Sequence, residues 1–159
     1  MKQLSEQEAL NKAAAYCTQC ERCTSEVMAK LTAWGMDYAR QERIIGTLIE
    51  ERFIDEQRYC HAFVNDKLRF NRWGRMKIAA ALREKRLPSA LISEALEQID
   101  EEEYNRILQA LMETKRKEIK AVDAYTAGQK LLRFVAGRGF EPALAMKLIK
   151  EEEGYEMDF

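Results

Sequence analysis

The sequence predicts an all-α protein of three tandem three-helix modules, because it combines helix-favouring residues, few breakers and an internal repeat. Only seven glycines and two prolines interrupt 159 residues that are rich in Ala, Leu, Glu, Lys and Arg. Three segments about 50 residues apart begin and end on an apolar residue: Leu31–Met36, Leu82–Leu87 and Val135–Phe140. A second apolar pair follows each segment eight and nine positions later: Ile44-Ile45, Ala95-Leu96 and Leu148-Ile149. Such a period predicts a helical array of about nine helices, each module resembling a helix-turn-helix unit, with a long surface for a partner.

The first module is predicted over residues 1–54. Its helices are expected near residues 5–19, 25–34 and 38–51. Thr24 or Ser25 has the side-chain oxygen of an N-cap for the second of these helices. Gly35 ends that helix, because glycine adopts the left-handed conformation found after many helices.

The second module is predicted over residues 55–100. Its helices are expected near residues 56–69, 72–85 and 88–98. Asp55 and Asn71 are the expected N-caps of the first two, and Gly74 weakens the first turn of the second. Pro88 is the expected first residue of the third helix, where its missing N–H costs nothing.

The third module is predicted over residues 101–153. Its helices are expected near residues 101–120, 124–136 and 142–153, and residues 154–159 are expected to form a loose tail. Asp123 is the expected N-cap of the middle helix, and Pro142 the first residue of the last. The acidic run at residues 100–103 is expected to open a helix, since carboxylates favour the positive end of the helix dipole.

Residues 67–86 form a basic stripe in a chain whose net charge is only −1. Eight cations in this stripe face one acid, Glu84, with Phe70 and Trp73 among them. Such a stripe suits an acidic protein face or nucleic acid, whereas a solvated helix face paired with acidic neighbours is the simpler alternative. Candidate contacts with a partner or DNA phosphate are Lys67, Arg69, Arg72, Trp73, Arg75, Lys77, Arg83, Lys85 and Arg86.

The relative positions of the side chains in the basic stripe depend on whether one helix runs through it without a break. Arg69, Arg72 and Arg75 are three residues apart, so they follow one side of a helix if it runs unbroken through Asn71 and Gly74. Trp73 either stacks on a base or partner ring, or anchors one module against the next. The same two interpretations apply to Trp34, for which the core is favoured.

Three cysteines form a C-x-x-C-x-x-C run at Cys17, Cys20 and Cys23, with Cys60 far along the chain. The spacing resembles part of an iron–sulfur run, and a zinc site would take Cys60 or His61 as fourth ligand. Packing is the favoured interpretation, because the three thiols would lie on one face if the first helix extended to Cys23, and buried free cysteine behaves as a small hydrophobe. We therefore expect no metal, with these three thiols as a weak alternative.

No enzyme motif is present in the sequence. The chain has one histidine and lacks the glycine-rich phosphate-binding patterns. We therefore expect neither catalysis nor a cofactor. No apolar run approaches the roughly 20 residues that span a bilayer, and no signal-peptide core follows Met1, so a cytoplasmic location without membrane contact is expected.

The chain resembles the RecX family of bacterial recombination regulators from about residue 9 to residue 150. The first module carries Glu26-Val27 and Lys30-Leu31, similar to the family's E-L-x-x-K-L, and then Gly35-Met36. The later motifs are the junction Phe53-Ile54-Asp55-Glu56-Gln57-Arg58-Tyr59, then Trp73-Gly74 with Ile78, Leu82 and Lys85, and finally Arg138-Gly139-Phe140. Three departures are Glu56 for the second acid of the junction, Cys60 for a small residue, and Arg86 for the usual glycine, where a residue with a Cβ must make the turn.

The resemblance implies a fold and a partner. Members have three tandem three-helix modules and bind the RecA recombinase filament on single-stranded DNA, lowering its ATPase and strand-exchange activity. The expected function is thus a non-enzymatic, monomeric regulator of recombination and DNA repair, with weak binding to single- or double-stranded DNA compatible with it. The alternative is a helical nucleic-acid-binding protein that acts through the basic stripe without RecA.

Overall fold

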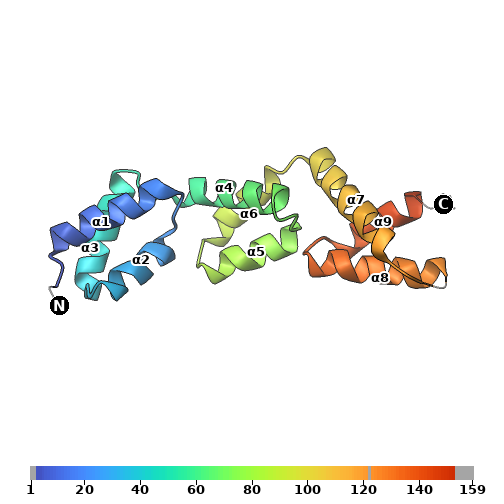
Figure 1. The fold of residues 1–159 in the computed structure, drawn as a ribbon. Helices are drawn as coiled ribbons and strands as arrows, with labels where there is room; N and C mark the ends of the chain where they lie inside the picture. Colours follow the sequence, from blue (N-terminus) through green and yellow to red (C-terminus); the bar gives the residue numbers. More distant parts are fainter. Residues whose placement is uncertain (1–2, 122, 153–159) are drawn as a thin grey trace. The chain divides into compact units, whose positions relative to one another are not determined.

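Every regular element in the described part of the chain is an α-helix, which confirms the predicted fold class (Figure 1). The computed structural model describes residues 3–121 and 123–152, so the predicted tail at 154–159 lies outside the described residues. The helices are α1 Glu6–Gln19, α2 Thr24–Ala33, α3 Tyr38–Glu50, α4 Glu56–Arg69, α5 Arg75–Glu84, α6 Ser89–Glu97, α7 Glu101–Glu118, α8 Ala124–Gly137 and α9 Pro142–Glu152. No helix within these ranges is both long and apolar enough to cross a bilayer.

Several helices begin where capping residues predict. The Asp55 carboxylate accepts the Arg58 N–H at 3.0 Å, and the Asp123 carboxylate accepts the Thr126 N–H at 2.7 Å. Hydrogen bonding to the Thr126 amide holds the pKa of Asp123 below its ordinary value. These two caps confirm the predicted starts of α4 and α8, since each satisfies a backbone donor that the helix leaves unpaired.

Three helix starts differ from prediction by one residue: α1 begins at Glu6 instead of residue 5, and α2 and α6 are also shifted. Cys23, rather than Thr24 or Ser25, is the N-cap of α2, and its N–H donates to the Glu26 carboxylate at 3.1 Å. Pro88 precedes α6 instead of opening it, and its carbonyl accepts the Ile92 N–H at 3.1 Å. The start of α2 lies one residue before the expected one and the start of α6 one residue after it, a shift of the size by which helix boundaries commonly differ.

The predicted start of α5 at residue 72 is wrong, because the helix begins at Arg75. Arg72 has a left-handed backbone, with φ of 55°, and belongs to the turn that ends α4. The Trp73 N–H donates back to the Lys67 carbonyl at 3.0 Å, and the Gly74 N–H donates to the Arg138 carbonyl at 2.8 Å. Asn71 is therefore no cap, and Gly74 lies before the helix.

The sequence repeat corresponds to a repeated turn at the end of three helices. Met36, Leu87 and Phe140 each donate an N–H to the carbonyl five residues earlier, at 3.0, 3.2 and 3.1 Å, and all three side chains are buried. The residue before each is left-handed: Gly35 at 83°, Arg86 at 64° and Gly139 at 93°. These are Schellman turns, in which a buried apolar residue follows a left-handed one. Arg86 thus makes with a Cβ the turn that glycine makes at the two other positions.

The described chain forms two compact units, and the middle three helices contribute to both. The first unit runs to Phe63 and includes Leu82–Ala95, whereas the second contains Val64–Ala81 and the chain from Leu96 onward. In the described part of each unit, the start of one helix contacts the Schellman turn that ends another. In the second unit this contact is the Gly74 N–H bond to the Arg138 carbonyl. In the first, Ser25 Oγ near the start of α2 donates to the Lys85 carbonyl at 2.7 Å. The predicted module boundaries at residues 54 and 100 stay predictions.

The first unit has its core among α1, α2 and α3, which pack against one another. The buried residues of this core recur at helical spacing: Ala9, Ala13 and Cys17 on α1, Val27 and Leu31 on α2, Ile44, Ile45 and Leu48 on α3, and Met36 and Ile54 beside them. Trp34 packs against this core, with the Lys12 ammonium 4.6 Å from its ring centroid. The preference for Trp34 as a core residue is confirmed.

The second unit has α8 packed against both α7 and α9. Its buried side chains include Tyr104, Leu108, Leu111 and Met112 on α7, Leu131 and Val135 on α8, and Ala145, Leu148 and Ile149 on α9. The rings of Tyr104 and Phe140 lie 5.2 Å apart between centroids. Gly74 and Gly139 allow the backbones to meet closely here, because a Cβ on Gly74 would lie 2.4 Å from the Gly139 carbonyl carbon.

Candidate partner-binding surface

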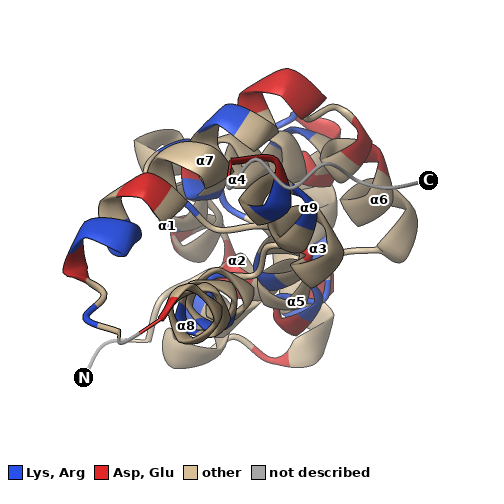
Figure 2. Ribbon diagram, turned by 90° about the vertical axis from the view of Figure 1, so that its right-hand side faces the viewer, with Lys and Arg blue, Asp and Glu red and all other residues tan. Residues whose placement is uncertain are grey.

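The basic stripe does not follow one helix face. It divides between the two units, with Lys67 to Lys77 in the second and Arg83 to Arg86 in the first. The helical path also breaks between Arg69, which ends α4, and Arg75, which begins α5. The condition under which Arg69, Arg72 and Arg75 would follow one side of a helix is therefore not met. Red and blue segments occur along the same helices in Figure 2, so both signs of charge are interspersed.

Three cations of the second unit, Arg69, Lys67 and Lys77, already contact a carboxylate or an aromatic ring of the same unit. Arg69 Nε donates to Glu103 Oε1 at 2.7 Å, and this bond keeps the pKa of the Glu103 carboxyl below its ordinary value. The ammonium groups of Lys67 and Lys77 lie 4.8 and 4.5 Å from the centroid of the half-buried Trp73 ring. Trp73 thus makes cation–π contacts inside the unit, and its stacking on a partner stays a prediction.

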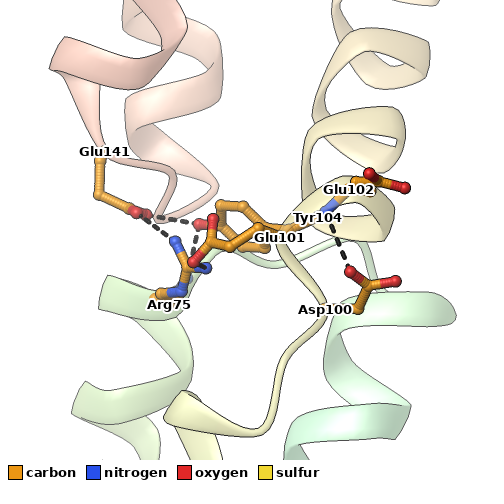
Figure 3. Close-up of polar contacts among 6 residues, drawn as sticks. All are labelled: Arg75, Asp100, Glu101, Glu102, Tyr104 and Glu141. Carbon is orange, nitrogen blue, oxygen red and sulfur yellow. Dashed lines mark hydrogen bonds and ion pairs between the residues drawn. The ribbon is translucent and has the colours of Figure 1, made fainter.

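Arg75 is largely enclosed, with 20% of its side chain exposed (Figure 3). Its guanidinium donates to Glu141 Oε2 at 2.7 Å and also to Glu101, and it lies 3.9 Å from the Tyr104 ring centroid. Burial opposes its charge, but the two carboxylates more than compensate, so the pKa of Arg75 lies above its ordinary value. Arg75 therefore joins α5 to α7 and to the turn before α9.

Tyr104 completes this cluster from the fourth position of α7. Its hydroxyl donates to Glu141 and accepts the Arg75 backbone N–H at 3.1 Å. Burial and the hydrogen bond to Glu141 raise the pKa of Tyr104. The cluster was invisible to sequence reasoning, because its members are 26 to 66 residues apart. The acidic run at residues 100–103 was the available signal. It does open α7, as predicted, with Asp100 as N-cap, but Glu101 and Glu103 also bind stripe cations.

In the first unit, Lys85 binds an internal carboxylate while Arg83 and Arg86 stay exposed. Lys85 Nζ lies 3.3 Å from Glu26 Oε2. Burial opposes ionisation of Glu26, but hydrogen bonds from the Cys23 amide and the Lys85 ammonium bring the pKa of Glu26 below its ordinary value. Within residues 3–121 and 123–152, no carboxylate pairs with the side chains of Arg72, Arg83 or Arg86. These three cations are the ones available to a partner.

The four cysteines do not assemble a metal site in the described ranges, where no group of three or more possible ligands converges. Helix α1 ends at Gln19, as predicted, so the condition under which the three thiols would share one helix face is not met. Cys20 is exposed in extended backbone, whereas Cys17, Cys23 and Cys60 are buried. Burial raises the pKa of the Cys60 thiol to about 11, which favours the protonated form and fits a packing role.

Comparison with known proteins gives this architecture a family. The family model of the second three-helix domain of RecX matches residues 55–96, which hold α4, α5 and nearly all of α6. The regulatory protein RecX of Clostridium tetani (strain Massachusetts / E88) is 32% identical over 117 residues, which are 72% of this chain and 53% of that protein. The chain belongs to the RecX family. The RecX of Amycolatopsis mediterranei (strain U-32) is 25% identical over 82% of this chain and 75% of its own length.

The fold agrees with solved RecX structures. The crystal structure of RecX from Lactobacillus salivarius superposes with a TM-score of 0.84 at 19% identity, covering 92% of this chain and 95% of that chain. A second RecX crystal structure gives a TM-score of 0.80 at 21% identity, covering 91% of this chain and 74% of that one. At such identities the likeness shows the fold alone, three-helix modules in tandem. The chain spans 62% of the length of the RecX proteins of two Clostridium botulinum strains, Eklund 17B and Alaska E43.

Proposed function

We propose that this RecX-family protein binds the filament that RecA recombinase forms on single-stranded DNA and lowers its ATPase and strand-exchange activity. Membership of the family is the observation that carries this proposal, since the matching relatives are named regulatory proteins. It acts as a cytoplasmic monomer and without chemistry of its own. The exposed cations Arg72, Arg83 and Arg86 are the parts of the predicted contact set best placed to meet a partner.

The internal pairing of the stripe supports a protein target over bare DNA. Eight phosphate contacts would make the logarithm of affinity fall with the logarithm of salt at a slope of about −7, whereas the three exposed arginines supply at most about −3. The rival function, nucleic-acid binding without RecA, needs the cations that Glu26, Glu101, Glu103 and Glu141 already engage. Lys67 and Lys77 are engaged as well, because both ammonium groups lie over the Trp73 ring.

The test is the ATPase rate of the cognate RecA on single-stranded DNA, measured at fixed moderate salt while this protein is titrated. Inhibition below one molecule per RecA protomer supports filament binding. Inhibition that appears only when the DNA is saturated supports the nucleic-acid rival, and no effect on RecA removes the proposal.

A double charge reversal tests the stripe itself. Arg83→Glu with Arg86→Glu should weaken inhibition, because both side chains are exposed and bind no carboxylate in the described chain. Lys147→Glu on α9 is the matched control, an exposed cation outside the stripe. Equal inhibition by the two folded variants would remove Arg83 and Arg86 from the contact. Arg75 is unsuited to this test, because its reversal would break the ion pairs with Glu101 and Glu141 inside the unit.

A further inference from the structure

The turn between α4 and α5 holds an exposed aromatic side chain in a fixed place. Phe70 is 80% exposed, although its N–H donates to the Asp66 carbonyl at 2.9 Å. The guanidinium of Arg138 donates to the Asn71 carbonyl at 3.1 Å, and the Arg138 carbonyl accepts the Gly74 N–H at 2.8 Å. These bonds fix the backbone of the turn and so the point from which the exposed ring projects, and exposed aromatic side chains are enriched among energetic hot spots.

Beside Phe70 the second unit has a groove of about 430 Å³. It lies between this turn, α7 and α8, and it is lined by Phe70, Asn71, Arg72, Leu111, Thr114, Lys115, Glu118, Phe134 and Arg138. Buried Leu111 and half-buried Phe134 supply apolar surface. Three cations and one acid among the lining residues make the groove electropositive.

Most of that positive charge is already engaged, and Arg72 is the exception. Lys115 lies 4.6 Å from the Phe134 ring centroid and 3.5 Å from the Glu118 carboxylate. The Arg138 guanidinium lies 5.4 Å from the same ring and donates to Asn71. Within the described ranges, the exposed Arg72 side chain has neither a carboxylate nor an aromatic partner. The left-handed backbone of the turn places it next to Phe70 in the groove lining.

We propose that this groove docks a protein segment in which a carboxylate adjoins an apolar side chain. The apolar side chain packs on Phe70, Leu111 and Phe134, and the carboxylate pairs with the guanidinium of Arg72 in the bidentate geometry that arginine favours. The inference rests on the proposed function, and it places this segment on the protein surface of the RecA filament.

The arrangement favours a protein segment over single-stranded nucleic acid. A strand needs several cations along its phosphates and open ring faces for its bases. Here Lys115 and Arg138 already have partners within the unit, so among the described lining residues Arg72 alone is left for a phosphate. One available arginine beside an apolar groove matches a single carboxylate with an apolar neighbour.

The experiment measures equilibrium binding of the purified full chain to RecA filaments assembled on single-stranded DNA with a non-hydrolysable ATP analogue. Phe70→Ala and Arg72→Gln should each weaken binding at least tenfold, as for hot-spot residues. Tyr125→Ala is the matched control for Phe70, an aromatic 77% exposed on α8 of the same unit, and Arg133→Gln is the control for Arg72. All four side chains are exposed, so circular dichroism and thermal unfolding should match the unchanged protein.

Binding of the four variants distinguishes the possible occupants of the groove. Loss of binding in Phe70→Ala and Arg72→Gln alone, with both control variants binding like the unchanged protein, supports the inference. If the unchanged protein binds and all four variants bind equally, the groove is not the docking site while the proposed function stands. If the unchanged protein does not bind the filament, both ideas fail. If Phe70→Ala instead reduces affinity for bare oligo-dT by the same factor, the occupant is nucleic acid and the inference is overturned.

Discussion

Replacing Gly74 with alanine tests the close backbone contact on which the second unit depends. A Cβ at this position would lie 2.4 Å from the carbonyl carbon and oxygen of Gly139 and from the Phe140 nitrogen. All three are backbone atoms, so the strain cannot relax by rotation of a flexible side chain. The turn before α9 must move away from the start of α5 if the variant folds.

The expected loss of stability follows from the contacts that separate. The Gly74 N–H bond to Arg138 at 2.8 Å and the Met76 N–H bond to Gly139 at 3.0 Å would both weaken. Two such bonds contribute roughly 1–3 kcal/mol, and overpacking adds about 1–3 kcal/mol. Alanine also restricts the unfolded chain, which offsets about 0.4–1 kcal/mol of the lost stability. We therefore expect Gly74→Ala to lower the free energy of unfolding by about 3 kcal/mol.

Urea unfolding followed by circular dichroism measures this change directly. With a slope of about 2 kcal/mol/M, the midpoint should fall by about 1.5 M. Gly128→Ala is the matched control, because no atom of another group lies within 4 Å of a Cβ there and the position is inside α8. That variant should be stabilised by about 0.5–1 kcal/mol.

Amide hydrogen exchange localises the effect. Protection of the Met76 amide, which bonds Gly139, should fall in Gly74→Ala, whereas the Met36 amide, which bonds Leu31 in the first unit, should keep its protection at low denaturant. A Gly74→Ala variant within 0.5 kcal/mol of the unchanged protein, with the Met76 amide still protected, would refute the reasoning.

Three further predictions concern single positions. Arg86→Gly should raise the free energy of unfolding by about 0.5–1 kcal/mol in urea titrations, since it relieves a left-handed residue with φ of 64° at a smaller entropic cost; a loss of stability would contradict this. Arg75→Met should cost about 1–2 kcal/mol, because it removes the cation from the half-buried Glu141 while Glu101 is largely solvated, and adding Glu141→Gln should recover part of the loss; an unchanged urea midpoint would show the cluster to be dispensable. The Cys60 thiol has an ordinary pKa of 9.0 and a folded pKa of about 11, so its contribution of about 3 kcal/mol is complete below pH 9 and is lost as the pH rises to about 11. Cys60→Ala should therefore lose less stability than the unchanged protein between pH 9 and pH 11, and parallel pH profiles would exclude this.

The apolar periodicity and the caps were sufficient to predict the helices because both depend on neighbours in the chain. Asp55 and Asp123 reach backbone amides three residues away, and each Schellman turn closes over six residues. The start of α5 was missed for the opposite reason. Gly74 is held by Arg138, 64 residues away in the chain, and no local pattern contains that partner.

The basic stripe shows the same difference between what neighbouring residues determine and what distant residues determine. Sequence alone identified its eight cations and the acids that balance them, because charge is a property of composition. Which cation meets which acid depends on long-range packing, and Arg69, Arg75 and Lys85 turned out to be partnered 26 to 66 residues away. Phe70 was noted only as an aromatic among charges, and its place beside a groove became visible with α7 and α8.

By itself the sequence determined the all-α class, the period of the repeat and the left-handed turns, since helix propensity, capping and turn formation act within about six residues. Only the tertiary structure decided which charges stay available to a partner. An ion pair or a groove forms between side chains that distant segments bring together, and the free energy that selects those neighbours comes from burying apolar faces such as Leu111 and Phe140, not from the local chain.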